Sequence, residues 1–248
     1  MKKLTLLFCC LLGLGLVTAC SSAPEPEDNK SAEQLYNTAY KLLNKTSYQK
    51  AAETFEKVEL EHPYSKWATK AKLMSAYAYY KDQNYDDAII SLDRFIKFHP
   101  GNKDIAYAYY MKGLCYYEQI TGVEKDQNNT KKALEAFRQV IVRFPDTEYA
   151  QDARLKLDLI YDHLAGQEME VGRYYLGQHN YLSALNRFSE VVNHYQTTSQ
   201  IEEALYRQVE IYKILGLEKE SADAFKVLGH NYPDSKWYKD ALRLQKKK

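Results

Sequence analysis

The sequence predicts an all-α protein, an α-solenoid of five helix pairs closed by a C-terminal capping helix. Two observations support this prediction. Helix breakers are scarce, with 10 Gly and 6 Pro in 248 residues, while hydrophobic residues make up 45% and charged residues 27% of the chain. This composition suits folded helices better than short strands or disorder. In addition, one amphipathic pattern occurs five times along the chain, which is typical of a repeat architecture.

The repeated pattern is an apolar stripe along one face of a helix. Each copy begins with a small residue, and larger apolar residues follow four and seven positions later, a spacing that places all three on one helix face. The small residues are Ala51, Ala88, Ala133, Ala184 and Ser221. The residues four positions later are Phe55, Leu92, Phe137, Phe188 and Phe225, and those seven positions later are Val58, Phe95, Val140, Val191 and Leu228. We therefore expect the second helix of each pair to bury this stripe.

The ends of the helices recur in the same register. Twelve positions after the small residue, proline stops the helix in four of the five copies, as Pro63, Pro100, Pro145 and Pro233, whereas the fourth copy has Gln196. Two positions further on stands a residue that can cap the next helix, namely Ser65, Asn102, Thr147, Thr198 and Ser235. Eight positions after the proline, each first helix has a small packing residue, namely Ala71, Ala108, Ala153, Ala204 and Ala241.

The intervals between the small residues are 37, 45, 51 and 37 residues, which is the range of helical solenoids. The longer second interval places a polar insertion loop at residues 121–129. The extra residues of the third interval lie between Ala153 and Gly172. They make nearly four helical turns, so they lengthen the first helix of the fourth pair and roughly keep its face.

Residues 1–19 have the features of a targeting segment and are kept apart from the fold. Two lysines precede an apolar run, and the run ends in the word LVTAC at residues 16–20. This word resembles the lipobox of bacterial lipoproteins. A retained membrane anchor is the alternative, since the run is just under the length that spans a bilayer.

The lipobox resemblance implies that residues 1–19 are a lipoprotein signal peptide and that Cys20 carries a covalent lipid. Ser21, rather than an aspartate, follows the cysteine, which in the lipoprotein pattern implies the outer membrane. The Pro-rich and acidic residues 20–30 are then a flexible tether. The folded domain is expected over residues 31–248.

Composition and motifs argue against an enzyme and against a nucleic-acid binder. The formal net charge is +1, and removal of Lys2 and Lys3 with the signal leaves about −1, so a polyanion has little to bind. The sequence has no metal-ligand motif, nucleophile elbow or phosphate loop. Cys115 is expected to be a buried hydrophobe, and His62 and His99 to be packing or cap residues. We expect no cofactor, no metal and no small-molecule substrate; a cryptic hydrolase is the rival from this class.

The repeat resembles the tetratricopeptide repeat. The small residue, the aromatic four positions later and the proline are preceded by Tyr48, Tyr85 or Tyr181, three positions before the small residue. Together with the lipobox, the words AYAYYK at residues 76–81 and LDRFIKFHP at residues 92–100, and a helix beginning ALNRF, the whole chain is similar to the BamD (ComL) family. This family supplies a lipoprotein of the outer-membrane β-barrel assembly machinery, BAM.

The family resemblance implies a lipid-anchored scaffold on the periplasmic face of the outer membrane. Its partners would be BamA and other BAM lipoproteins, and its clients nascent, unfolded outer-membrane proteins that are folded and inserted. Arg187, in ALNRF, matches the arginine through which the family contacts an acidic side chain of BamA, and it precedes the core residue Phe188, so that it can point outward. The rival is a tetratricopeptide scaffold of another envelope machine, such as pilus secretin assembly or peptidoglycan synthesis.

Tyrosine is unusually frequent, with 23 residues, and its spacing predicts a binding groove. When Ala39, Ala76 and Gly113 are taken as packing positions, neighbouring positions line a concave face in the N-terminal part, about residues 31–120. The C-terminal half, about residues 121–248, is left for partner binding. Tyrosine combines apolar area with a hydroxyl and suits an extended polypeptide, although some of these side chains also fit interior positions. The candidates are Tyr36, Tyr40, Leu73, Tyr77, Tyr80, Tyr110 and Tyr117.

Overall fold

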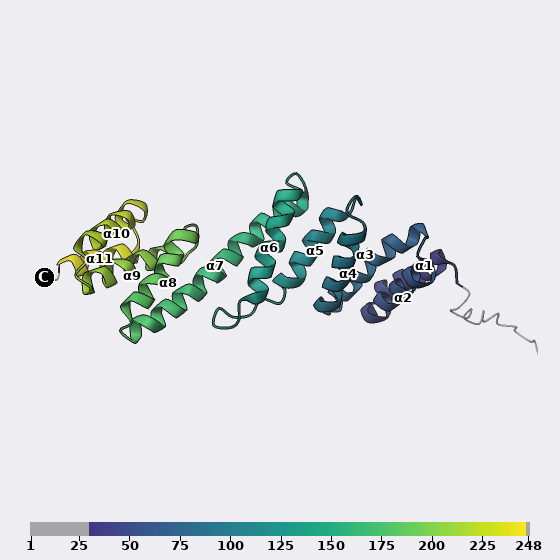
Figure 1. Cartoon of the computed structure of the whole chain (residues 1–248), viewed down its shortest axis with the longest axis horizontal. Helices are drawn as coiled ribbons and strands as arrows, with labels where there is room; N and C mark the ends of the chain where they lie inside the picture. The colour runs from purple at the N-terminus through teal and green to yellow at the C-terminus, as the bar shows by residue number, and fades with distance from the viewer. Residues whose placement is uncertain (1–29, 247–248) are drawn as a thin grey trace, which may run out of the picture.

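The computed structural model describes residues 30–246, which form eleven α-helices and no β-strand. Consecutive helices pack side by side into an elongated array (Figure 1). The helices are α1 (Ala32–Asn44), α2 (Tyr48–Glu61), α3 (Lys66–Lys81), α4 (Tyr85–Phe98), α5 (Ile105–Tyr117), α6 (Asn128–Arg143), α7 (Glu148–Gly177), α8 (Tyr181–His194), α9 (Ile201–Ile214), α10 (Glu218–Asn231) and α11 (Lys236–Lys246). The predicted all-α solenoid of five pairs is confirmed, and α11 packs on α9 and α10 as the capping helix. The predicted signal peptide and Cys20 lie outside the described residues.

The apolar stripe forms the core of each pair. The small residue of each copy is at most 1% exposed, and the residue seven positions later is equally buried. Four of the five residues at the middle position have no exposed surface, while Phe225 in the last pair is partly buried. The alanines of the first helices, from Ala71 to Ala241, are fully buried as well. Burial of one stripe per pair thus accounts for the register read from the sequence.

Two glycines permit the closest approach within a pair. A Cβ atom at Gly113 would lie 2.6 Å from Cε1 of Phe137, and one at Gly172 would lie 2.6 Å from Cε1 of Phe188. Both phenylalanines are stripe residues with no exposed surface. Because real Cβ atoms do not approach a ring so closely, these positions require glycine for the observed packing of α5 on α6 and of α7 on α8.

Every second helix ends in the same backbone conformation. The C-cap residues have φ between −131° and −135° and ψ between 41° and 58°, and each donates its N–H to the stripe carbonyl four residues earlier. They are His62, His99, Phe144, Tyr195 and Tyr232. Tyr195 adopts this conformation although Gln196 follows it, so proline favours the turn but is not required for it. The cap role expected for His62 and His99 is confirmed.

The N-cap expectation holds at three of the five positions, Ser65, Thr147 and Ser235, and is shifted at the other two. Ser65 and Thr147 accept hydrogen bonds from the backbone N–H groups of Ala68 and Ala150, at 3.1 and 3.2 Å. In contrast, α5 and α9 begin three residues after Asn102 and Thr198. The Thr198 hydroxyl donates to the carbonyl of Tyr195 at 2.7 Å, the Asn102 side chain accepts from the N–H of Asp104 at 2.9 Å, and Ser235 accepts from the N–H of Trp237 at 3.1 Å. The Asn102 and Thr198 side chains thus stabilise the turn instead of the first helical turn, whereas Ser235 directly precedes α11 and caps its first turn.

The short turns inside four of the pairs share a left-handed residue. Thr46, Gln83, His179 and Gly216 have φ of 58°, 61°, 57° and 72°. Three of these positions carry a side chain, although the left-handed region disfavours one. The fold therefore holds some backbone strain at the turns after α1, α3 and α7.

The two insertions have distinct outcomes. The long first helix of the fourth pair is confirmed as α7, with 30 residues. The polar loop is displaced relative to the predicted residues 121–129, because α6 begins at Asn128 and the connection from α5 spans residues 118–127. Within residues 30–246, no helix is both long and apolar enough to cross a membrane.

Candidate partner-binding surface

An aromatic strip runs along the first helices of the second to fourth pairs, formed by Tyr77 and Tyr80 of α3, Tyr107, Tyr110 and Tyr117 of α5, and Tyr149 of α7. The rings of Tyr107 and Tyr149 are 5.5 Å apart, and those of Tyr110 and Tyr149 are 5.4 Å apart. All six side chains are partly buried, so each combines a packed ring with an accessible edge. Tyr107 and Tyr149 were missed by sequence reasoning, because the strip was sought only at three positions of each helix.

Carboxylates hold the hydroxyl ends of this aromatic strip. Tyr110 donates a short hydrogen bond to Asp152 of α7, and Tyr80 donates to Glu118 at 3.3 Å. Burial is the main cause that raises the pKa of Tyr80, to about 12, and the Glu118 carboxylate adds to it. Burial likewise raises the pKa of Tyr110, with the Asp152 bond as the next cause. These tyrosines are therefore neutral at physiological pH and keep a hydroxyl that can donate or accept.

A lysine completes the end of the aromatic strip. The Lys156 ammonium lies 5.1 Å from the ring centre of Tyr117 and 3.4 Å from an Asp152 oxygen. The cation–π contact joins α5 to α7, whereas the ion pair lies within α7. The surface thus carries apolar rings with the carboxylates of Glu118 and Asp152 and the ammonium group of Lys156, which suits a polypeptide whose backbone and side chains are both exposed.

The structure divides the seven groove candidates into three groups. Tyr77, Tyr80, Tyr110 and Tyr117 lie together in the aromatic strip, and Tyr40 stands apart on α1 with 47% exposure. Tyr36 and Leu73 differ from the expectation, since they are only 5% and 9% exposed. Tyr36 packs against Phe55 and Trp67, with ring centres 5.2 and 4.8 Å apart. These two residues belong to the packed interior rather than to an open groove.

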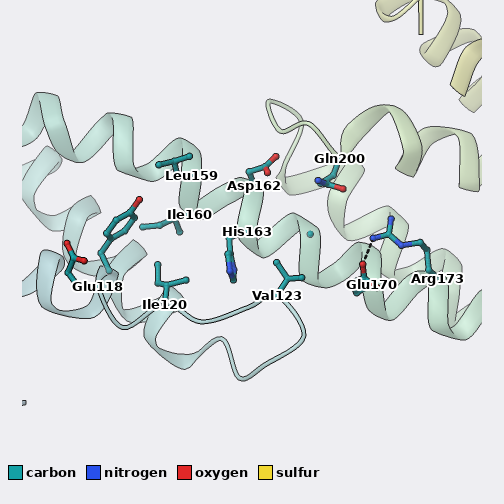
Figure 2. Close-up of a pocket in the computed structure, with 12 residues that line it drawn as sticks. Glu118, Ile120, Val123, Leu159, Ile160, Asp162, His163, Glu170, Arg173 and Gln200 are labelled. Atoms are coloured by element: carbon teal, nitrogen blue, oxygen red, sulfur yellow. Dashed lines mark hydrogen bonds and ion pairs between the residues drawn. The ribbon is translucent and has the colours of Figure 1, made fainter. Parts of the chain in front are cut away.

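A pocket adjoins the aromatic strip at Tyr117 and Glu118. It has a volume of about 620 Å³ and lies between the 118–127 loop, α7 and the start of α9. Figure 2 shows Ile120 and Val123 of the loop facing Ile160 and His163 of α7, with Glu170 paired to Arg173 at the far end. The pocket therefore has an apolar middle with charged groups around it, and it extends the surface toward the C-terminal half.

Gln127 organises this pocket. Its side chain is nearly buried, and its Nε2 donates to the carbonyls of Lys125 and Gly122 at 3.0 and 3.2 Å. This orients Oε1 to accept from the Thr130 hydroxyl at 2.8 Å and to lie 3.0 Å from Nδ1 of His163. Because Oε1 is an acceptor, Nδ1 carries the proton of the neutral imidazole. His163 thus anchors the loop to α7, a role that its isolated position in the sequence does not indicate.

Arg187 lies on the outer surface of α8, as its helical phase predicts. Its side chain is 44% exposed, and Nη1 is 3.0 Å from Oε2 of Glu168 on α7, a carboxylate that is only 19% exposed. Both residues border a shallow cavity of about 460 Å³, together with Tyr175 and Glu190. The guanidinium is therefore already oriented by one carboxylate and keeps an open side toward solvent.

Cys115 and the histidines show no chemical site. The Cys115 thiol has no exposed surface, and burial raises its pKa to about 12, so it is a structural residue. Across the described chain from residue 30 to residue 246, no three His, Cys, Asp or Glu side chains are grouped to hold a metal ion. Cys20 lies outside these residues.

Paired helices stacked in register, with an aromatic and a charged surface on successive helices, define a helical-repeat scaffold of the tetratricopeptide type. The chain belongs to the YfiO family of outer membrane lipoproteins, whose model matches residues 28–227. This assignment confirms the family resemblance seen in the sequence.

Two curated relatives support the same assignment. The chain is 48% identical over 246 residues to the outer membrane protein assembly factor BamD of Rickettsia prowazekii (strain Madrid E), covering 98% of both chains. It is 46% identical over 217 residues to BamD of Caulobacter vibrioides, covering 88% of this chain and 71% of that relative. Among solved structures, the complex of the yeast Sti1 TPR2AB domain with pHSP90 is 14% identical, with a TM-score of 0.42 and coverage of 86% of this chain and 84% of that one.

Proposed function

We propose that this protein is an outer-membrane protein assembly factor that acts as a scaffold and catalyses no reaction. The near-complete alignment with a relative of that name, at 48% identity over 98% of both chains, carries the proposal. The membership in a family of outer membrane lipoproteins places it at the outer membrane. We infer that a lipid on Cys20 holds it on the periplasmic face and that residues 20–30 are the tether.

The aromatic strip is proposed as the surface for nascent β-barrel clients. An unfolded outer-membrane protein presents alternating apolar side chains and unpaired backbone groups. The partly buried rings of Tyr77, Tyr107 and Tyr110 offer apolar contact, and their hydroxyls offer hydrogen bonds, at a low cost in rotamer entropy. The strip is continuous with the pocket beside α7, which also includes Tyr117. This supports the proposal, because an extended client segment needs a long binding surface.

Arg187 is proposed as the contact to BamA. An acidic side chain of the partner can approach the exposed side of the guanidinium while Glu168 holds the other side at 3.0 Å. A guanidinium binds two carboxylates well, because its five donors form a rigid fork. Removing the arginine then leaves the partner's carboxylate unpaired, so Arg187→Ala should weaken association by about 2 kcal/mol or more, which is about 30-fold in Kd.

The test is a pull-down of the full-length, lipidated protein from envelope membranes in mild detergent. BamA is expected with the natural chain and is expected to be lost with Arg187→Glu. Arg243→Glu is the matched control, because Arg243 also lies in the C-terminal half and is 77% exposed, with a surface pair to Asp240 at 2.7 Å. Recovery of BamA with Arg187→Glu at the level of the control would refute the contact. Recovery of a pilus secretin or a cell-wall synthase in place of BamA would move the function to another envelope machine.

A further inference from the structure

The described chain begins beside one particular turn of the solenoid. Nε2 of His62 donates to the carbonyl oxygen of Lys30 at 3.0 Å. Ser31 then caps α1 and makes a capping box with Gln34. The tether therefore enters the fold next to the turn between α2 and α3, residues 62–65, and its last residue is fixed there.

The same turn displays two apolar side chains that have little to pack against. Tyr64 is 102% and Leu60 81% exposed, which are the highest values among the large hydrophobic residues between 30 and 246. Both lie within four residues of Pro63 and outside the core of the first pair. Scattered exposed apolar residues are ordinary, but these two share the one edge at which the chain enters the fold.

Two lysines and a tryptophan follow Tyr64 in the chain, at the start of α3. Lys66 and Lys70 are exposed on the first turns of α3, with their ammonium groups 5.7 and 5.9 Å from the ring centre of Trp67. Glu61 lies at the same edge, and Leu60 also borders Glu53, Glu56 and Glu59, of which Glu59 is paired with Lys72 and Arg94. Aromatic rings flanked by lysines are typical of surfaces at the level of lipid headgroups, where the ring stays at the interface and the ammonium reaches phosphate.

We propose that this edge, formed by Leu60, Tyr64, Lys66 and Lys70 and here named the membrane tip, docks on the lipid surface of the outer membrane. The proposal rests on the lipid anchor at Cys20 inferred above. Residues 20–30 span at most about 35 Å, so the tip stays close to the lipid into which the anchor inserts. A short linker gives the second contact an effective concentration of about a millimolar, so a patch that is weak alone is occupied. Docking would orient the array relative to the membrane.

The first experiment measures depth by fluorescence. The full-length lipidated protein is incorporated into vesicles of phosphatidylethanolamine and phosphatidylglycerol at a ratio of about 3:1, with a quencher on the lipid headgroups. A single polarity-sensitive dye is attached in the Tyr64→Cys variant, which labels selectively because Cys115 is buried. The matched control is Tyr174→Cys, since Tyr174 is 65% exposed on α7. We expect quenching at position 64 to exceed that at position 174 at least twofold, and equal quenching would overturn the docking.

Two further experiments test the apolar and the charged contribution to docking separately. Leu60→Glu in the labelled variant should abolish the excess quenching at position 64. Because Leu60 is 81% exposed, the substitution should leave the fold intact. Unchanged quenching would overturn a role for this side chain. Replacing phosphatidylglycerol by phosphatidylcholine should reduce the excess if the lysines bind anionic headgroups, and no change would remove them from the proposal. Flotation with vesicles tests the lipid anchor separately from the docking of the membrane tip. A chain that does not float refutes both the anchor and the docking. A chain that floats without excess quenching at position 64 refutes the docking alone.

Discussion

Replacing Gly172 by alanine tests the closest packing contact between α7 and α8. The added Cβ would lie 2.6 Å from Cε1 and 2.9 Å from Cζ of Phe188. The ring has no exposed surface, so it cannot turn toward solvent without opening the core of the fourth pair. Either the two helices separate by some tenths of an ångström or the ring leaves its rotamer.

The expected cost follows from two opposing contributions. Overpacking of a filled core costs about 2 kcal/mol, within a range of 1 to 3. Alanine is a better helix former than glycine by about 1 kcal/mol in a helix interior. The net change is a loss of about 1 kcal/mol in the free energy of unfolding, which lowers Tm by about 3 °C for a domain of this size.

Gly177→Ala is the matched control, because no atom lies within 4 Å of a Cβ at that position in the same helix. It should raise the free energy of unfolding by about 0.5 kcal/mol through helix propensity alone. Urea unfolding followed by far-ultraviolet circular dichroism measures both variants. The double variant Gly172→Ala/Phe188→Leu should show coupling, since the smaller side chain makes room for the methyl group. If Gly172→Ala stabilises the protein as much as Gly177→Ala does, the packing argument is wrong.

Three other outcomes are expected. Gln83 has φ of 61°, in the left-handed region that is unfavourable for residues with a side chain, so Gln83→Gly should raise the free energy of unfolding by about 1 kcal/mol. Gly216 has φ of 72°, so Gly216→Ala should lower the free energy of unfolding. Urea titration measures both variants. The Cys115 thiol, whose pKa is raised to about 12 by burial, should not react with a thiol reagent at pH 8 in the folded protein but should react in urea; an equal rate in both states would contradict its burial. The pKa of Tyr80 is raised to about 12, above the value near 10 of an unfolded tyrosine, so this contribution to stability is complete below pH 10 and is lost as pH rises toward 12. Tyr80→Phe should flatten that alkaline loss of stability, and an unchanged pH profile would argue against the shift.

The core was predictable because its determinants are local. The spacing of Ala133, Phe137 and Val140 fixes one helix face, and the same spacing in every pair leaves few alternative registers. Helix ends were less regular, as Asn102 and Thr198 show, because a capping side chain can bond either the turn or the helix.

The surface was only partly predictable. In the first helix of a pair, the position three residues before the packing position Ala39 or Gly113 is Tyr36 or Tyr110. Both tyrosines contact the phenylalanine of the stripe in the second helix. Helical phase alone places this position at the boundary of the core, so neighbouring helices decide whether the side chain is buried. The α7 pocket depends on Gln127 meeting His163 across 36 residues, and the position of Arg187 depends on Glu168 across 19 residues. No sequence signal reports such distant pairs.

The uninterrupted α7 fixes the relation between the two halves of the molecule. Asp152, which holds the aromatic strip, and Glu168, which holds Arg187, stand on the same helix, separated by about 24 Å along its axis. A single residue inserted between them would lengthen the spacing by about 1.5 Å and rotate one surface against the other by about 100°. The helix thus sets both the distance and the angle between the proposed client surface and the proposed partner contact at Arg187. An insertion of seven residues, close to two full turns, should preserve the angle while it increases the distance.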